Sequence, residues 1–428
     1  MKKRDYKRFE QVNGEYTFKT IPIDSYDVFE DDLEIIVTDI EYMADMGTLL
    51  SMLGYDNDTD YFFKQCREII SVPEKHINEK GEGKFTFQTY FYNFPDSVMS
   101  INKDALVVIV LHPHKEYKNG KREFNVVGYV HVNRFDVYWE GERFDGYYYN
   151  MLRIGEQMEN GKKLYRRKKI FTLMFSIMHS IVDVDKNIAF AYGAMGKENQ
   201  AINEALELNT KLYNKHYEKW PFKNNTHVNK TFGSSSAFQK CIDITDDEEK
   251  LKEFFRLIQK QKSHYAFYHM NSEDDLLHMV RKIKEYSNSS RVYMVPDANG
   301  NIAAACMAMN WGEYFQFTLQ NPKGLFKFVA NMKLTDNLLY PFLVVGEPAA
   351  ADTLLRGIAH KYAKQHKCYL TTINAYEGDP YFKTKKSLLS DDYLFLIITN
   401  DVPKLNAMKE KSKGSDGNVK LFIDNPLL

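Results

Sequence analysis

The spacing of apolar positions divides the first half of the chain into strands and helices. Two β-branched stretches, residues 104–114 and 124–135, flank a polar segment that contains glycine, and this order predicts a β-hairpin. Residues 146–154 are apolar and rich in aromatic side chains, which predicts another strand. The periodicity beyond them predicts a helix, a short buried strand and a long amphipathic helix, over residues 170–182, 187–195 and 199–220.

A similar order of elements returns later in the chain. The polar stretch 223–238 carries glycine, serine and asparagine, which favours a long loop or a domain boundary. The pattern after it predicts two helices with acidic first turns, a hairpin, a strand, a helix, a strand, a short helix and a closing strand. These elements span residues 246–261, 272–286, 290–311, 338–345, 349–365, 368–374, 379–388 and 392–399. We therefore expect two domains, residues 1–235 and 236–428.

Length and charge narrow the possible functions. The chain has 428 residues, more than the roughly 250–300 that a single hydrophobic core ordinarily holds. Its 57 basic residues nearly balance its 58 acidic ones, so nucleic acid is not an expected partner and any anion site must be local. The sequence has no apolar run long enough to span a membrane and no apolar segment after the basic N-terminus. We expect a cytoplasmic protein with no membrane partner.

Neither cysteine nor histidine spacing indicates a metal site. The four cysteines are Cys66, Cys241, Cys306 and Cys368. They lie far apart and lack the spacing of a zinc site or a disulfide framework, so we expect reduced, buried thiols. His112 and His114 share one face of a predicted strand, but the sequence shows no further ligand spaced to join them. No metal cofactor is expected.

Three strings resemble motifs of one protein family. The string DPYFKTKKSLLSDDYLFLIIT, residues 379–399, resembles the closing segment of the GNAT superfamily of acyl-CoA-dependent N-acyltransferases, in which a short helix precedes the last strand. The strings KNGKREFNVVGYVHV and DANGNIAAACMA resemble the second and third strands of that family. The resemblance covers residues 105–220 and 246–399. It implies an α/β (α+β) fold of two tandem GNAT-like domains, each a central mixed β-sheet flanked by helices.

The GNAT family binds the pyrophosphate of coenzyme A with a glycine-containing loop between its fourth strand and the next helix. In the first half the basic run KKLYRRKK, residues 162–169, holds this position without a glycine. The resemblance implies that arginine and lysine side chains contact the phosphates instead. A solvated lead-in to a core helix, or contact with nucleic acid, are the alternatives for this run. The implied cofactor-binding residues of the loop are Arg166, Arg167, Lys168, Lys169, Ile170, Phe171 and Thr172.

The corresponding loop of the second half, residues 346–351, keeps small residues but has no arginine or glutamine. Glu347 would put a negative charge beside a phosphate, and the segment also fits an ordinary helix start. The first half is therefore the expected cofactor site.

Acyl transfer to an amine requires a base for the amine and an acid for the departing thiolate. The resemblance implies Glu156 as the base and Tyr213 as the acid, whereas an exposed carboxylate and a packing tyrosine are the plainer alternatives. Asn199 resembles the asparagine that contacts the pantetheine arm in family members, or else it caps a helix. In the second half Phe382 replaces the family's tyrosine, unless the adjacent Tyr381 substitutes for it.

The leading hypothesis is a cytoplasmic N-acyltransferase. Its first half would use acetyl-CoA or another acyl-CoA to acylate an amine of a small molecule or a peptide. One alternative is a GNAT-fold protein that binds a ligand without catalysis. The other is a Fem-like aminoacyltransferase, which pairs two such domains and uses aminoacyl-tRNA. The sequence leaves the acyl group, the acceptor and the oligomeric state open.

Overall fold

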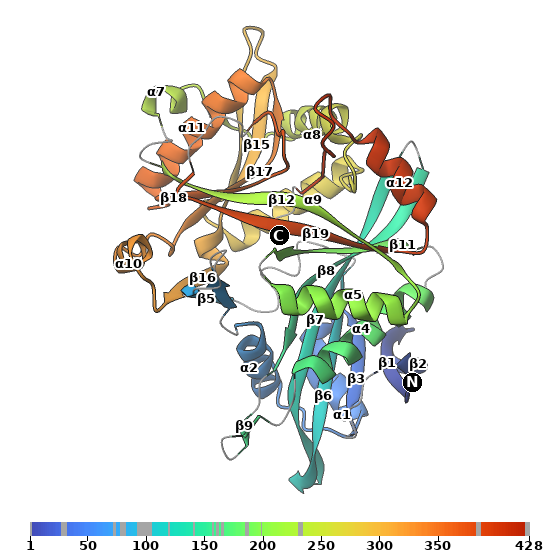
Figure 1. Cartoon of the computed structure of the whole chain (residues 1–428). Helices are drawn as coiled ribbons and strands as arrows, with labels where there is room; N and C mark the ends of the chain where they lie inside the picture. Colours follow the sequence, from blue (N-terminus) through green and yellow to red (C-terminus); the bar gives the residue numbers. More distant parts are fainter. Residues whose placement is uncertain are drawn as a thin grey trace.

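Strands from both halves of the chain form one large β-sheet in the computed structural model (Figure 1). The sheet has fourteen strands in parallel and antiparallel pairs, and helices cover both of its faces. The structure describes residues 2–26, 32–71, 74–77, 83–91, 105–118, 120–139, 142–155, 158–159, 162–163, 167–184, 188–197, 199–229, 234–381 and 387–423. The predicted α/β class with a mixed sheet is confirmed.

The first half follows most of the predicted order of elements. Its elements are β1 (Lys2–Val12), β2 (Glu15–Ser25), β3 (Glu34–Asp39), η1 (Ile40–Asp45), α1 (Met46–Met52), α2 (Thr59–Ile70), β4 (Glu74–Ile77), β5 (Gly83–Phe91), β6 (Ala105–Lys118), β7 (Lys121–Trp139), β8 (Glu142–Ile154), β9 (Met158–Glu159), β10 (Lys162–Lys163), α4 (Arg167–Val184), β11 (Ile188–Gly196), α5 (Gln200–Leu212) and β12 (His216–Val228). The predicted hairpin, aromatic strand, helix and buried strand correspond to β6 with β7, β8, α4 and β11.

The second half also follows its predicted order. Its elements are α7 (Ser235–Phe238), β13 (Ile242–Asp243), α8 (Glu248–Lys262), α9 (Glu273–Tyr286), β14 (Arg291–Pro296), β15 (Ile302–Asn310), η2 (Trp311–Glu313), β16 (Phe315–Gln320), α10 (Leu325–Asn331), β17 (Leu338–Gly346), α11 (Pro348–Gln365), β18 (Leu370–Ala375), β19 (Leu389–Thr399) and α12 (Val402–Lys411). α8 and α9 have the acidic first turns that the sequence predicted, and Ser272 and Asp275 form a capping box at α9.

The two halves exchange strands at the centre of the sheet. The strand order is β13-β14-β15-β17-β18-β12-β19-β11-β8-β7-β6-β3-β1-β2. The first-half strand β12 lies between β18 and β19, and the second-half strand β19 lies between β12 and β11. We call this arrangement the strand exchange. The division into domains 1–235 and 236–428 stays a prediction, because one sheet runs through both.

Three clusters of buried apolar side chains join the sheet to its helices. α4 contributes Leu173 and Ile177 to a cluster that includes Val130 of β7. The largest cluster spans both halves, from Phe62 of α2 to Phe254 of α8. The third lies under α11. The core therefore continues across the junction between the halves.

The loop after α8, residues 265–271, also connects the halves. Asn271 donates a hydrogen bond from Nδ2 to the carbonyl oxygen of Asp136 on β7, over 2.6 Å. Phe267, in the middle of this loop, is fully buried although its φ is 62°. We call residues 265–271 the bridging loop.

Two predictions of local structure were wrong. The helix predicted over residues 199–220 ends at Leu212, and Asn214, with φ of 53°, leads into β12. Trp220 and Phe222 alternate with exposed neighbours and face the core, which is strand spacing. The loop predicted over 223–238 is partly wrong for the same reason, since its first residues belong to β12. The helix predicted over 379–388 falls largely outside the described residues, and its described ends form turns and a bend.

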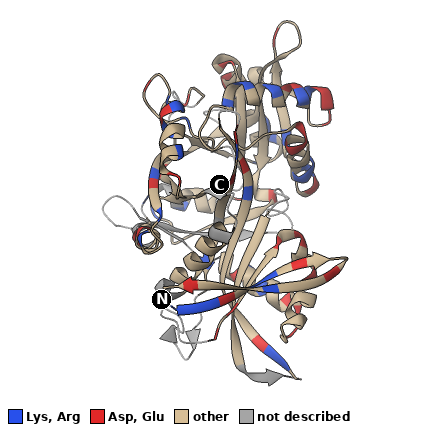
Figure 2. Cartoon of the chain, turned by 90° about the vertical axis from the view of Figure 1, so that its right-hand side faces the viewer, with Lys and Arg blue, Asp and Glu red and all other residues tan. Residues whose placement is uncertain are grey.

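Three of the four cysteines are buried, as the sequence analysis expected. All four are free, and Cys66, Cys306 and Cys368 are buried, whereas Cys241 is only partly buried. Burial raises the pKa of the Cys66 thiol, which keeps it protonated and unreactive. Basic and acidic residues are interspersed over the molecule (Figure 2). None of the described helices is long and apolar enough to cross a membrane.

Candidate functional site

The parallel strands β8 and β11 separate toward their carboxyl ends. They pair from Asp145 opposite Ile188 to Tyr149 opposite Gly193, and β8 then continues to Ile154 with no described pairing to β11. A Cβ on Gly193 would lie 2.9 Å from the carbonyl oxygen of Tyr149, so glycine permits the close approach at the last pair. Beyond it the two strands no longer satisfy each other's backbone groups, which can bind a ligand.

A β-bulge accompanies this separation. Tyr129 of β7 pairs with Arg153 of β8, and His131 pairs with Asn150, so β8 holds one residue more than β7 over this interval. A bulge bends its strand and increases the local twist. The bulge therefore gives a physical reason for β8 to turn away from β11.

The basic run follows β8, as the sequence analysis expected, but its last three residues already belong to α4. Lys162–Lys163 form β10, and Arg167 is the first residue of the 18-residue helix α4. Glu156 and Arg166 lie outside the described residues, as do the side chains of residues 167–169. The N-terminus of a helix carries a partial positive charge that favours an anion. The start of α4 and the basic run thus both favour an anionic ligand.

The next residues of α4 pack into the core. Ile170 and Phe171 are buried against the sheet, and Thr172 is half-buried. The Thr172 carbonyl accepts a hydrogen bond from the hydroxyl of Ser176 over 2.8 Å. Any contact of Ile170 or Phe171 with a phosphate would therefore use the backbone N–H groups.

The structure does not bring Asn199 and Tyr213 together. Asn199 is the exposed N-cap residue of α5 and makes no side-chain capping bond, whereas Tyr213 is the C-cap of the same helix. At a rise of about 1.5 Å per residue, the fourteen steps between them span roughly 21 Å. They cannot both contact one reacting atom.

The hydroxyl of Tyr213 belongs to a hydrogen-bond network between β2 and α4. It lies 2.9 Å from the carbonyl oxygen of Asp24 and 2.5 Å from Ser176 Oγ. Ser176 Oγ also lies 2.9 Å from Ser25 Oγ. The imidazole of His179 packs against the Tyr213 ring, with centroids 4.6 Å apart. The network fixes the orientation of the phenol.

In the second half two side chains close the loop at residues 346–351, which the resemblance would make a phosphate loop. The backbone N–H of Gly346 donates to Gln261 Oε1 over 2.7 Å. The Tyr381 hydroxyl lies 3.0 Å from that oxygen and 3.1 Å from the Gly346 carbonyl oxygen. Glu347 follows as the exposed N-cap of α11. The N–H that could approach a phosphate already has a partner, and a carboxylate lies next to it.

The second-half strands β17 and β18 separate as β8 and β11 do. Their pairing ends at Leu339 opposite Thr371. β17 carries a bulge in its pairing with β15. Beyond the last pair, Asn374 Nδ2 lies 3.0 Å from the Tyr340 hydroxyl and bridges the two strands. Side chains therefore link β17 to β18 where the two strands separate, and Gln261 and Tyr381 close the loop that follows β17.

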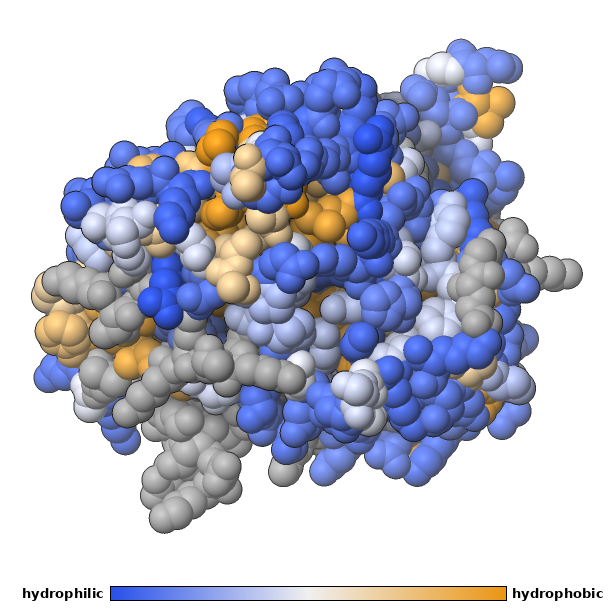
Figure 3. Space-filling model, turned by 90° about the horizontal axis from the view of Figure 1, so that it is seen from above, coloured by the Kyte–Doolittle hydropathy of each residue, from blue (hydrophilic) through white to orange (hydrophobic). Residues whose placement is uncertain are grey.

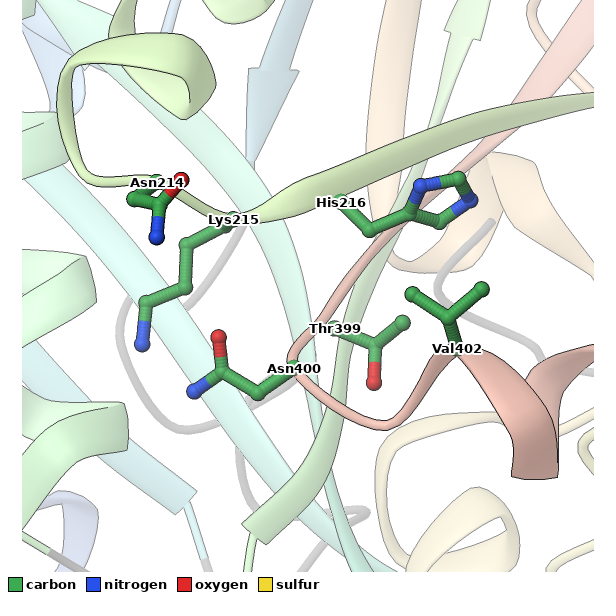
Figure 4. Close-up of a pocket in the computed structure, with 6 residues that line it drawn as sticks. All are labelled: Asn214, Lys215, His216, Thr399, Asn400 and Val402. Atoms are coloured by element: carbon green, nitrogen blue, oxygen red, sulfur yellow. The ribbon is translucent and has the colours of Figure 1, made fainter.

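A cavity of about 300 Å³ lies away from both separations (Figure 4). Thr399, which lines it, pairs with Phe190 near the amino end of β11, whereas β8 and β11 separate at the carboxyl end. Lys215 points to one side of the cavity with Asn400, and His216 points to the other. The remaining lining residues are Asn214 and Val402. This cavity is not part of the candidate acyl-CoA site.

Sequence reasoning missed Gln261 and Ser176. Gln261 lies near the end of α8, 85 residues before the glycine it contacts, and no local pattern marks it. Ser176 is a buried serine inside the apolar pattern of α4. A buried hydroxyl needs a hydrogen-bond partner, which is the one signal that could have drawn attention to it.

No protein-family model matches the sequence, and no curated protein matches it. Solved structures do match. N-myristoyltransferase of Saccharomyces cerevisiae with bound myristoyl-CoA matches 94% of this chain and 89% of its own, with a TM-score of 0.50 and 10% identity. A second structure of that enzyme, with myristoyl-CoA and inhibitors, matches 94% and 86%, with a TM-score of 0.51 and 11% identity. A GCN5-related N-acetyltransferase from Kribbella flavida matches 69% and 60%, with a TM-score of 0.40 and 11% identity.

The chain has the fold of N-myristoyltransferase. The likeness extends over most of the chain, so it includes both halves. β8 and β11 contain the strands predicted over residues 146–154 and 187–195, and the basic run follows the first of them. At sequence identities of 10% and 11%, the structural likeness shows the fold and not the substrate.

Proposed function

We propose that the chain is an acyl-CoA-dependent N-acyltransferase whose first half binds the acyl-CoA. The observation that carries the proposal is the separation of β8 from β11 shortly before the basic start of α4. Pantetheine carries amide groups that can bond to unpaired strand backbone, and its pyrophosphate suits a basic helix start. These two features lie next to each other in the first half only.

The predicted site residues take these roles in the proposal. The side chains of Arg166, Arg167, Lys168 and Lys169 bind the phosphates, aided by the backbone of residues 170–172. Asn199 contacts the pantetheine arm. Glu156 is the base and Tyr213 the acid. For Tyr213 to act, the leaving thiolate must reach the hydroxyl that now contacts Ser176.

The donor we propose is acetyl-CoA, and the acceptor is an amine of a small molecule or a peptide. The related yeast structures hold myristoyl-CoA, so the length of the acyl chain is itself a question for experiment. The second half binds no coenzyme A in this proposal, because Gln261 occupies the N–H of Gly346. The cytoplasmic location expected from the sequence is part of the proposal.

Calorimetric titration with acetyl-CoA and with myristoyl-CoA tests the site. We expect one acyl-CoA per chain, and binding of the Arg166→Ala/Arg167→Ala variant weakened at least roughly a hundredfold, because each of the two lost charge-assisted hydrogen bonds contributes about 1.5–3 kcal/mol in a favourable geometry. The Lys240→Ala/Lys260→Ala variant is the control, since it removes two exposed cations away from the site.

Three results would contradict the proposal. The wild-type chain could bind neither thioester. The double arginine variant could bind as tightly as the control. A stoichiometry of two would show that the second half also accepts coenzyme A.

A further inference from the structure

The helix α10 presents exposed apolar side chains at the edge of the molecule. Phe328 and Met332, which ends the helix, are 57% and 56% exposed. Seen from above, one area of apolar surface lies at the left edge, the side on which Figure 1 shows α10, and a larger one lies near the middle (Figure 3). We define the α10 patch as Phe328, Met332 and the three lysines Lys323, Lys327 and Lys333.

Among the described residues, the lysines of the α10 patch have no acidic partner. All three are exposed, and the described residues offer none of them an ion pair. Residues 314–335 contain no aspartate or glutamate. Some lysines elsewhere differ, since Lys250 and Lys252 on α8 pair with glutamates. The α10 patch is therefore both apolar and positively charged.

The rest of the fold holds this helix in place. Val329, on the inner side of α10, is buried. After the helix, Thr335 donates from Oγ1 to the carbonyl oxygen of Phe317 on β16 over 3.3 Å. β16 in turn pairs with β5 of the first half. The buried Val329 and the hydrogen bond of Thr335 to β16 thus fix the orientation of α10, with Phe328 facing solvent.

We propose that the α10 patch docks the protein on an anionic lipid surface. Exposed aromatic and methionine side chains gain free energy by entering the boundary between headgroups and acyl chains. Lysines have long apolar stems that let the ammonium groups reach lipid phosphates. Each lysine near an anionic surface adds about 1 kcal/mol. Two apolar anchors and three unpaired lysines suit a reversible contact.

This inference departs from the sequence expectation of no membrane partner. It is also independent of the proposed acyl-CoA site, which lies in the first half. A cationic, apolar patch could also bind an acidic protein surface. The experiment below distinguishes a lipid surface from such a protein partner.

Vesicle sedimentation of the full chain tests the proposal. We expect binding to vesicles in which about one quarter of the lipid is phosphatidylglycerol, little binding to pure phosphatidylcholine, and weaker binding as salt rises. Lys327→Glu/Lys333→Glu should lower the partition coefficient at least roughly thirtyfold, from two contributions of about 1 kcal/mol each. Phe328→Ser/Met332→Ser should lower it at least about tenfold.

Two matched controls accompany these variants. Lys240→Glu/Lys260→Glu makes the same change of net charge at exposed positions elsewhere, and Leu208→Ser/Leu212→Ser removes two exposed apolar side chains of α5. Both should bind vesicles like the wild type. Circular dichroism shows that each variant is folded.

Failure of the wild type to bind anionic vesicles overturns the proposal and favours an acidic protein partner. Equal binding to both kinds of vesicle, or equal loss in the controls, overturns it too. The affinity of the same variants for acyl-CoA should equal that of the wild type. The test of lipid docking is therefore independent of the test of the acyl-CoA site.

Discussion

Phe267 has a backbone conformation that is costly for its side chain. Its φ of 62° lies in the left-handed region, where a residue other than glycine loses about 1–3 kcal/mol. Its ring lies 4.9 Å from that of Tyr192, 5.1 Å from Phe395 and 5.6 Å from Trp220, between centroids. These three rings belong to β11, β19 and β12, the strands at the exchange. Aromatic packing there offsets the backbone strain.

Because Phe267 is strained, we expect its glycine variant to be more stable than its alanine variant, which reverses the usual order. Either Phe267→Ala or Phe267→Gly should destabilise the fold by about 3–5 kcal/mol through the lost ring. Glycine usually costs about 1 kcal/mol more than alanine, but at positive φ it relieves strain. We therefore expect Phe267→Gly to be the more stable of the two by about 1 kcal/mol in urea unfolding.

Phe254 provides the matched control. It is fully buried in the helix α8. There Phe254→Gly should be less stable than Phe254→Ala, which is the ordinary order. The same order at both positions would show that Phe267 is not strained.

At the scale of elements, the helix α12 is held to the strand β12 by one carboxylate. Glu218 Oε2 accepts hydrogen bonds from Lys409 Nζ over 2.8 Å and from Trp220 Nε1 over 2.7 Å. Burial alone would raise the pKa of Glu218, but hydrogen bonds from Lys409, Trp220 and His216 outweigh it and lower the pKa. The charged form of Glu218 therefore stabilises the fold.

Replacing Glu218 should give a pH-dependent loss of stability. A lowered folded-state pKa means that the stabilisation is present above the unfolded-state value of about 4.3 and disappears as pH falls through the folded-state pKa. We expect Glu218→Gln to cost about 1–2 kcal/mol at neutral pH, and less below about pH 4. Urea unfolding at both pH values measures the difference.

Glu410→Gln on the same helix is the control. Glu410 pairs with Lys413 on an exposed surface, where such a pair contributes little. A loss in Glu218→Gln that stays constant with pH would contradict the assigned role of its charge.

The elements that sequence could predict are those whose pattern is local. α4, α8 and α9 show their apolar positions within a few turns, α8 and α9 also show their caps, and the prediction of all three helices is confirmed. β12 was missed because its partners β18 and β19 lie more than a hundred residues later. The basic start of α4 was predictable for the same local reason. The closure of the Gly346 loop by Gln261 was not, since it depends on where α8 packs.

At the scale of the whole molecule, the strand exchange makes the halves depend on each other. Removal of the second half would leave β11 without its neighbour β19 and β12 without either partner. An open strand edge is prone to pair with other chains. The tandem order seen in the sequence therefore does not imply two separately stable units.

Expression of residues 1–235 and 236–428 as separate chains checks this dependence. We expect each fragment alone to aggregate, because its exchanged strands lack partners. Produced together, the fragments should copurify as a complex of one each and bind acyl-CoA as the intact chain does. Size-exclusion chromatography measures the outcome. A folded, monomeric first fragment would show that β19 is dispensable to it.

The strand exchange also sets a waiting time during synthesis. β12 ends at Val228 and its partner β19 ends at Thr399, so on the order of 170 residues must be added before the central pairs can form, which takes on the order of ten seconds at about 5–20 residues per second. During that interval the edge of β11 is open while the ribosome is still at work. A chaperone that binds exposed strands can bind the chain during this interval. Slower translation would lengthen the time in which the unfinished sheet can aggregate.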